Sequence, residues 1–236
     1  MDTNTLIQQL ADSSKPLRLL YNPWARTGVW LAISLPSVFL VVLLVSPRED
    51  IFVKLGDGRF FLEQFAAIAT SIASAIAAFA STIPGYNRKY LLLPILPFSV
   101  WLGTLGVGCL HDLSLGGVHG ATLHADWFCI PGIIIAGAIP GLAIVVMLKR
   151  GAPLTPTLSI ALAGLAAAGL GDFGLRLFHP EDAGLVVLIW QFGTVFGLSL
   201  LAGWLGRYVL KWRSVSVAHR DMYLGVRSSE RQRADR

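Results

Sequence analysis

Apolar residues gather in six long runs that are separated by short polar stretches. We place these runs near residues 28–46, 61–83, 90–110, 127–148, 157–178 and 185–209. Each run approaches or exceeds the roughly 20 residues that a helix needs to cross about 30 Å of hydrocarbon. The alternation of apolar and polar residues that is typical of membrane β-strands is absent from the sequence. The pattern therefore predicts an all-α, polytopic membrane protein with six transmembrane helices.

Composition agrees with a membrane protein. Of the 236 residues, 54% are hydrophobic and 14% are charged, against about 25% charged residues in an ordinary soluble domain. The first run starts too late and is too long for a cleaved signal peptide, and no small-residue cleavage site follows it. We expect three parts, namely a cytoplasmic N-terminal segment, a membrane domain and a basic cytoplasmic tail, with bounds 1–27, 28–210 and 211–236.

Basic residues predict the orientation of the helices. The N-terminal segment, the loops at 85–89 and 149–156, and the C-terminal end of the chain from Arg207 onward together hold 15 of the 19 lysines and arginines. Cytoplasmic loops of membrane proteins carry such an excess of positive charge. We therefore expect both termini in the cytoplasm. The loop at 111–126 would then face outward, into a periplasm if the host is Gram-negative.

Both cysteines lie at the same end of two consecutive runs. Cys109 ends the third run and Cys129 begins the fourth, and the expected loop between them holds His111, His119 and His124. Thiols and imidazoles bind soft metals, and thiols also react with oxidants. The arrangement favours a metal or redox sensor that binds a soft metal transiently and has no resident cofactor. Two other interpretations stay open, because a cysteine often packs as a small apolar residue and an oxidising compartment can join the pair as a structural disulfide.

Ionisable residues are rare inside the predicted spans. Asp172 and Arg176 are four residues apart near the outer end of the fifth span, so they share a helix face and can pair. Such a pair is either functional, as intramembrane charge is by default, or a structural element that fixes the position of the helix. We expect Gln191 to form an interhelical hydrogen bond in the last span. Glu63 lies at the mouth of the second span, where we expect it to reach water.

The N-terminal segment carries apolar side chains in a polar context. Residues 5–8 fit a helix capping box, and Pro16 would stop the short helix that follows. Such a helix is marginal alone in water, so the segment is either a partner-binding element or a loosely ordered lead-in to the first span. Trp24 and Arg26 are typical of anchoring at the membrane interface. The candidate partner-binding residues are Leu6, Ile7, Leu10, Leu17, Leu19 and Leu20.

Catalytic motifs are missing from the sequence, which has no H-E-x-x-H, no G-x-S-x-G and no phosphate-binding loop. We therefore expect no enzyme. Glycine and proline interrupt the third, fourth and fifth runs, and broken helices can line the site of a transporter. A small transporter or permease subunit is the alternative to a signalling protein, although the membrane interior offers almost no ionisable group to bind a substrate.

Several short motifs occur in a fixed order along roughly residues 1–213, namely Pro23-Trp24, Pro84-Gly85, Trp127-Phe128-Cys129, the stretch 150–156, Pro180-Glu181-Asp182, Trp190, Gly206-Arg207 and Trp212. This ordered set resembles the negative-regulator-of-sigma-F family of proteobacterial membrane proteins. The resemblance implies a six-helix anti-sigma factor in the bacterial inner membrane that does not contact nucleic acid directly. Its cytoplasmic N-terminus would hold an extracytoplasmic-function sigma factor, and heavy-metal or oxidative stress felt through paired cysteines would release that factor.

Two positions depart from the family pattern. Many members carry a second cysteine just before the Pro-Glu/Asp-Asp motif and a Trp-His pair in the last span, where this chain has His179 and Gln191. The partner of Cys129 would then be Cys109, and His179 is a candidate metal ligand that cannot form a disulfide. The tail beyond residue 213 lies outside the resemblance, and its polar, basic composition predicts that it stays disordered or lies against anionic lipid.

Overall fold

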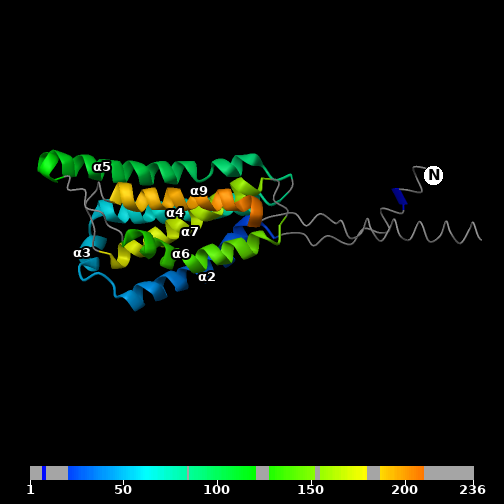
Figure 1. The fold of residues 1–236 in the computed structure, drawn as a ribbon, viewed down its shortest axis with the longest axis horizontal. Helices are drawn as coiled ribbons and strands as arrows, with labels where there is room; N and C mark the ends of the chain where they lie inside the picture. Colours follow the sequence, from blue (N-terminus) through cyan, green and yellow to red (C-terminus); the bar gives the residue numbers. More distant parts are fainter. Residues whose placement is uncertain are drawn as a thin grey trace, which may run out of the picture.

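The computed structural model describes residues 7–8, 21–83, 85–120, 128–151, 155–179 and 187–209. These ranges are almost entirely helical and contain no strand. Six helices are long and apolar enough to cross a membrane, and they lie side by side in one bundle (Figure 1). The predicted all-α fold with six candidate spans is therefore confirmed from the length and composition of the helices. The side on which each terminus lies stays a prediction.

The elements follow the predicted runs closely. Their bounds are α2 Pro23–Val45, α3 Ile51–Leu55, α4 Gly58–Ala80, η1 Arg88–Leu92, α5 Ile95–Gly120, α6 Cys129–Leu148, α7 Pro156–Phe178, η2 Val187–Phe192 and α9 Gly193–Val209. The short element η1 is a 3-10 helix, and η2 is a π-helix that leads into the last span. Two of the spans have a side-chain N-cap. The side-chain oxygen of Asn22 accepts a hydrogen bond from the Trp24 amide, and that of Asp57 accepts one from the Arg59 amide.

The end of the third span differs from the prediction. The helix α5 continues to Gly120, although the apolar run ends near residue 110. Cys109 therefore lies within a helix, and His111 and His119 lie on its continuation rather than in a loop. This part of α5 reaches past the rest of the bundle (Figure 1). Hydropathy marks only the part of a helix that contacts hydrocarbon, so it gives no sign of a helix that continues into water.

Helices α4 and α7 form the centre of the bundle, and α7 packs against α2, α4, α6 and α9. The small residues of α4 are buried there, as expected for close helix packing in a membrane, and they include Ala66, Ala67, Ala73, Ala75, Ala77 and Ala78. A Cβ atom at Gly171 of α7 would lie 2.5 Å from the carbonyl oxygen of Ile133 in α6. Only glycine permits this approach of the two backbones.

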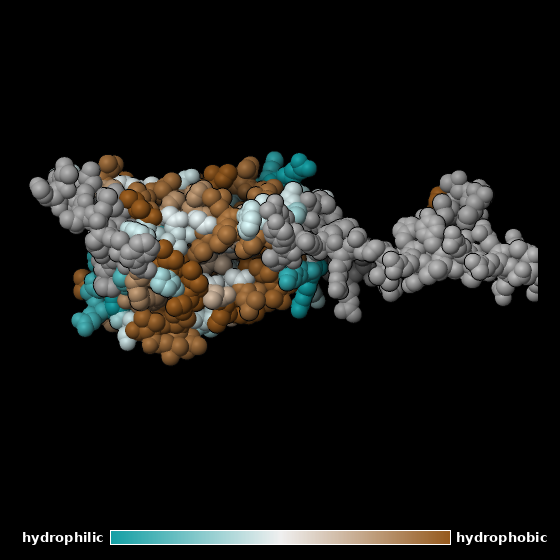
Figure 2. Space-filling model, viewed as in Figure 1, coloured by the Kyte–Doolittle hydropathy of each residue, from teal (hydrophilic) through white to brown (hydrophobic). Residues whose placement is uncertain are grey.

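The outward-facing side chains are mostly apolar. Figure 2 shows apolar residues along the bundle and hydrophilic residues near its two ends. Leu43, Leu44 and Leu142 are 70%, 76% and 68% exposed in the isolated chain. A surface of this kind suits hydrocarbon rather than water. The six helices thus indicate a membrane protein.

Much of the predicted partner-binding segment lies outside the described residues. Ile7 is described and is 58% exposed, whereas no placement is given for Leu6, Leu10, Leu17, Leu19 and Leu20. The same holds for His124 and for the tail from residue 210 onward. The division of the chain into three parts therefore stays a prediction.

Candidate functional site

A buried ion network lies at the end of the bundle where α4 begins and α7 ends. We call it the cysteine end, because Cys129 begins α6 there. Nη2 of Arg176 is 3.0 Å from Oε2 of Glu63, and both side chains are almost fully buried. Nε of Arg59 lies 3.5 Å from the other carboxylate oxygen of Glu63, and the Arg176 guanidinium lies 5.3 Å from the centre of the Phe60 ring. Two cations therefore compensate the buried carboxylate of Glu63, and the face of the Phe60 ring stabilises one of these cations, the Arg176 guanidinium.

This network corrects the expectation that Glu63 reaches water, because that residue is 4% exposed. Asp172 is equally buried and lines the same small cavity as Arg176. A hydrogen bond between Asp172 and Arg176 stays a prediction, whereas the ion pair of Arg176 with Glu63 is a contact that the sequence analysis missed. The sequence contained one signal for this pair. Glu63 lies near the start of α4 and Arg176 near the end of α7, so two antiparallel spans would place them at the same depth in the membrane.

Arg48 forms hydrogen bonds that connect the end of α2 to the end of α7. Its guanidinium donates two hydrogen bonds to the carboxylate of Asp50, at 2.6 and 2.8 Å. Its backbone N–H donates to the carbonyl oxygen of Leu177 at 3.1 Å, which satisfies one of the carbonyls that the end of a helix leaves open. These hydrogen bonds hold the connection between α2 and α3 in contact with the end of α7, at the cysteine end.

The two cysteines lie on helices with different main neighbours. Cys129 is fully buried in a core cluster with Ile133, Leu175 and Phe178. Cys109 is half-buried on α5, one helical turn beyond Leu105 of the same cluster. No disulfide joins the cysteines in the described part of the chain. Helix α5 packs mainly on α4, whereas α6 packs on α7 and α2, and α5 and α6 lie on opposite sides of the bundle (Figure 1).

His179 is the predicted ligand that lies beside the start of α6. Its ring is 5.3 Å from the ring of Phe128, the residue directly before Cys129. His111 is exposed on α5, and the side chain of His119 lies outside the described residues. Among the residues that the structure describes, no three histidine, cysteine or acidic side chains gather into a group that could hold a metal ion.

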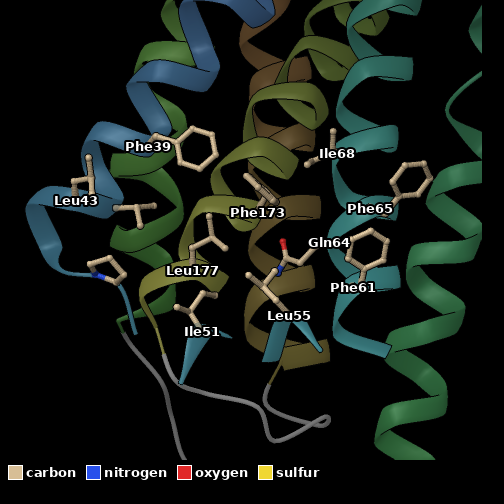
Figure 3. A pocket seen from close by; sticks show the side chains of 12 residues that line it. Phe39, Leu43, Ile51, Leu55, Phe61, Gln64, Phe65, Ile68, Phe173 and Leu177 are labelled. Carbon is tan, nitrogen blue, oxygen red and sulfur yellow. The ribbon is translucent and has the colours of Figure 1, made fainter. Parts of the chain in front are cut away.

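A groove of about 480 Å³ opens between α2, α3, α4 and α7 (Figure 3). Phe39, Phe65 and Phe173 contribute aromatic walls from three different helices, and Leu55 belongs to the short helix α3. The groove is apolar except at Gln64. Its lining offers no catalytic constellation and no charged group for a polar substrate.

At the opposite end of the bundle, Arg26 joins three helices. The guanidinium donates to Oγ1 of Thr82, just after α4, at 3.1 Å, and to the carbonyl oxygen of Met147, in α6, at 2.6 Å. It also lies 4.4 Å from the centre of the Phe79 ring. Arg26 is 7% exposed, so its side chain lies against the bundle and not at the lipid interface as expected, whereas anchoring by Trp24, which is 52% exposed, stays a prediction. The open carbonyls and the negative dipole at the end of a helix favour a cation here.

Two hydrogen bonds at different heights of the bundle therefore connect α6 to α2. Besides the contact of Arg26 with Met147, Nε1 of Trp30 donates to the carbonyl oxygen of Pro140 at 2.9 Å. Trp30 is fully buried. A single packed helix therefore runs from Cys129, at one end of the bundle, to the contact with Arg26 at the other.

The helices and the two end clusters define a helical bundle with six candidate membrane spans. Comparison with known families identifies it further. The family described as negative regulator of sigma F matches residues 10–212, and because this match covers most of the chain, the protein belongs to that family. The resemblance inferred from the short motifs is therefore confirmed.

A characterised relative is similar over part of the chain. The anti-sigma-F factor NrsF of Caulobacter vibrioides (strain NA1000 / CB15N) is 34% identical over 85 residues. The similar segment makes up 36% of this chain and 39% of that relative. No solved structure matches the chain.

Proposed function

We propose that the protein is a membrane-bound anti-sigma factor that holds an extracytoplasmic-function sigma factor at the cytoplasmic face of the bacterial inner membrane. The family match over residues 10–212 carries this proposal, since it includes all six candidate spans and reaches into the N-terminal segment. The name of the similar Caulobacter protein, an anti-sigma-F factor, supports the same role. The function is regulatory and requires no reaction.

The N-terminal segment is the proposed binding element for the sigma factor. Its leucines and Ile7 precede the first span, and the segment is too short and too polar to bury them by itself. Each leucine that a partner buries well can contribute roughly 1.5–3 kcal/mol to the complex. The buried contacts of Arg26 fix the point at which this segment enters the bundle.

The charges of the bundle support an orientation with both termini in the cytoplasm. At the cysteine end, Arg48 pairs with Asp50, and Arg59 and Arg176 pair with Glu63. Much of the positive charge at that end is therefore compensated. The loops at 85–89 and 149–151, at the opposite end, carry four further basic residues, as expected for a cytoplasmic face.

The proposed signal is a soft metal or an oxidant that reacts with outward-facing thiols. Cys109 is the more accessible thiol, and Cys129, although buried, begins α6 beside His179. Packed helices shift as near-rigid bodies. A displacement of α6 at Cys129 would therefore move the Met147 carbonyl against Arg26, at the base of the segment that holds the sigma factor. The family match favours this regulatory role over the alternative of a small transporter or permease subunit.

Co-purification tests the proposed function. The full-length protein, extracted from membranes in detergent, should retain the sigma factor, and Leu6→Asp combined with Leu10→Asp should abolish this retention without changing membrane insertion. The matched control, Gln8→Glu with Gln9→Glu, adds the same charge at polar positions of the same segment and should retain the partner. Unchanged co-purification of the sigma factor with the double aspartate variant would count against the proposal.

A further inference from the structure

Four buried polar atoms border one small cavity between α4, α5, α7 and η2. Within the described residues, Oδ1 of Asp172, Oε1 of Gln64 and both polar side-chain atoms of Gln191 have no hydrogen-bond partner. These three side chains belong to residues that are 4%, 8% and 1% exposed. All three line the same cavity, next to Glu63 and Arg176 of the ion network. Buried polar groups in folded proteins nearly always have a partner, so their concentration at one cavity indicates a bound ligand.

The size of the cavity limits that ligand to a single small molecule. Its volume is about 10 Å³, which is close to the minimum that one water molecule requires. Trp101 of α5 closes part of the wall and is 2% exposed. An organic ligand therefore does not fit.

The polar groups around the cavity match water better than a metal cation. Gln191 offers both a donor and an acceptor, whereas the open atoms of Asp172 and Gln64 are acceptors. A water molecule donates and accepts hydrogen bonds, so it can bind all three side chains at once. A cation would require oxygen ligands alone, and here it would meet the N–H of Gln191 and the positive charge of Arg176.

We propose that this cavity binds one water molecule, held by Asp172, Gln64 and Gln191, which ties α4 and α7 to the π-helical start of the last span. The π-helix η2 supports the proposal, because a π-helical turn re-aims side chains and is often found at functional sites. The hydrogen bond expected between Gln191 and another helix is not formed directly within the described residues. It would instead run through the water molecule. This inference does not depend on the proposed anti-sigma function.

Water-selective NMR tests the site in the full-length, isotope-labelled protein in detergent micelles. The side-chain amide protons of Gln191 should show a cross-peak to a long-lived bound water molecule. The indole N–H of Trp30 is a matched control, since it is fully buried and already bonded to the Pro140 carbonyl, and it should show no such cross-peak. A resolved Gln191 amide signal without a water cross-peak would overturn the proposal.

The second test uses a variant and a change of salt. Both are followed by the water cross-peak of the Gln64 side-chain amide. Gln191→Leu places methyl groups in the cavity and should remove the water cross-peak of Gln64. Ser199→Ala alters a buried hydroxyl of the same span that is bonded to the Val195 carbonyl, and it should leave that cross-peak intact. Persistence of the cross-peak in Gln191→Leu would exclude the proposed site. Replacing sodium by choline at constant ionic strength should change neither the cross-peak nor the melting midpoint, and a dependence on sodium would assign the cavity to a cation instead.

Discussion

The carboxylate of Glu63 and the guanidinium of Arg176 meet at 3.0 Å inside the bundle, although the two residues are 113 positions apart in the sequence. The contact joins α4 to α7, the two central helices. Both side chains are almost fully buried. Removing the charge of Glu63 would therefore leave the buried Arg176 guanidinium without this carboxylate.

We predict that Glu63→Gln destabilises the protein strongly. Removing one partner of a buried ion pair costs about 3–5 kcal/mol, because the remaining charge stays buried. Unfolding in a detergent titration measures the effect. Glu49→Gln, which changes an exposed carboxylate near the same end, should alter stability by less than about 0.5 kcal/mol. Equal stability of Glu63→Gln and the wild type would show that the pair contributes nothing.

Gly171→Ala should separate α6 from α7. The new Cβ atom would lie 2.5 Å from the Ile133 carbonyl oxygen, so the backbones must move apart at a cost of about 1–3 kcal/mol. Gly28→Ala provides the control, because a Cβ atom there meets nothing within 4 Å, and alanine favours a helix over glycine by up to about 1 kcal/mol. Thermal melting of both variants in detergent should give shifts of opposite sign, and a loss of stability in Gly28→Ala alone would contradict this packing.

Arg26→Met should loosen the end of the bundle that carries the N-terminal segment. The variant loses the hydrogen bonds to Thr82 and to the Met147 carbonyl, each worth roughly 1.5–3 kcal/mol for a charged donor. On the proposed function, transcription from a sigma-dependent promoter should rise without any inducer. Lys89→Met removes an exposed charge from the neighbouring η1 and should leave transcription low. Low transcription in both variants would show that Arg26 plays no part in retaining the sigma factor.

The two thiols should differ in their reaction with a reagent that cannot cross the membrane. Cys109 is half-buried and Cys129 fully buried, so in spheroplasts the reagent should label Cys109 faster. Labelling of single-cysteine variants, followed by mass spectrometry, measures the two rates. Denaturation in detergent should make the rates equal. Labelling only after the membrane is permeabilised would place the cysteine end in the cytoplasm and reverse the proposed orientation.

Cys129→Ser should leave retention of the sigma factor intact and abolish its release by soft metals or oxidants. Cys109→Ser should have the same effect if both thiols are needed, and His179→Ala should raise the inducer concentration required. The measurement is promoter activity before and after exposure. Ser114→Ala, on the same exposed continuation of α5, is a control that should respond like the wild type. Full induction of the double serine variant would leave the cysteines as packing residues.

The helices could be predicted from the sequence because hydrocarbon imposes a minimum length on an apolar run. The predicted bounds at Leu148, Phe178 and Val209 match the structure. The continuation of α5 to Gly120 could not be predicted in the same way. The part of α5 beyond the apolar run contains polar residues such as Ser114. By hydropathy alone, such a stretch cannot be distinguished from a loop.

The contacts between helices were harder to predict than the helices themselves. A pattern along one span shows that Arg176 needs a partner, but the partner depends on which helices are neighbours, and the order of spans in the sequence does not determine that. Arg26 illustrates the same difficulty. Its position beside Trp24 is typical of an interface anchor, and only the packing of α4 and α6 against α2 shows that its charge is buried.

The contacts of Arg26 also determine how the bundle would carry mechanical force. The residues before Asn22 enter the bundle through the first turn of α2, where Arg26 is bound to Thr82 and to the Met147 carbonyl. A bound protein that pulls on the N-terminal segment would therefore load three helices at once. On the proposed function, the guanidinium would distribute the load of a bound sigma factor among these helices and would hold α2 against its neighbours.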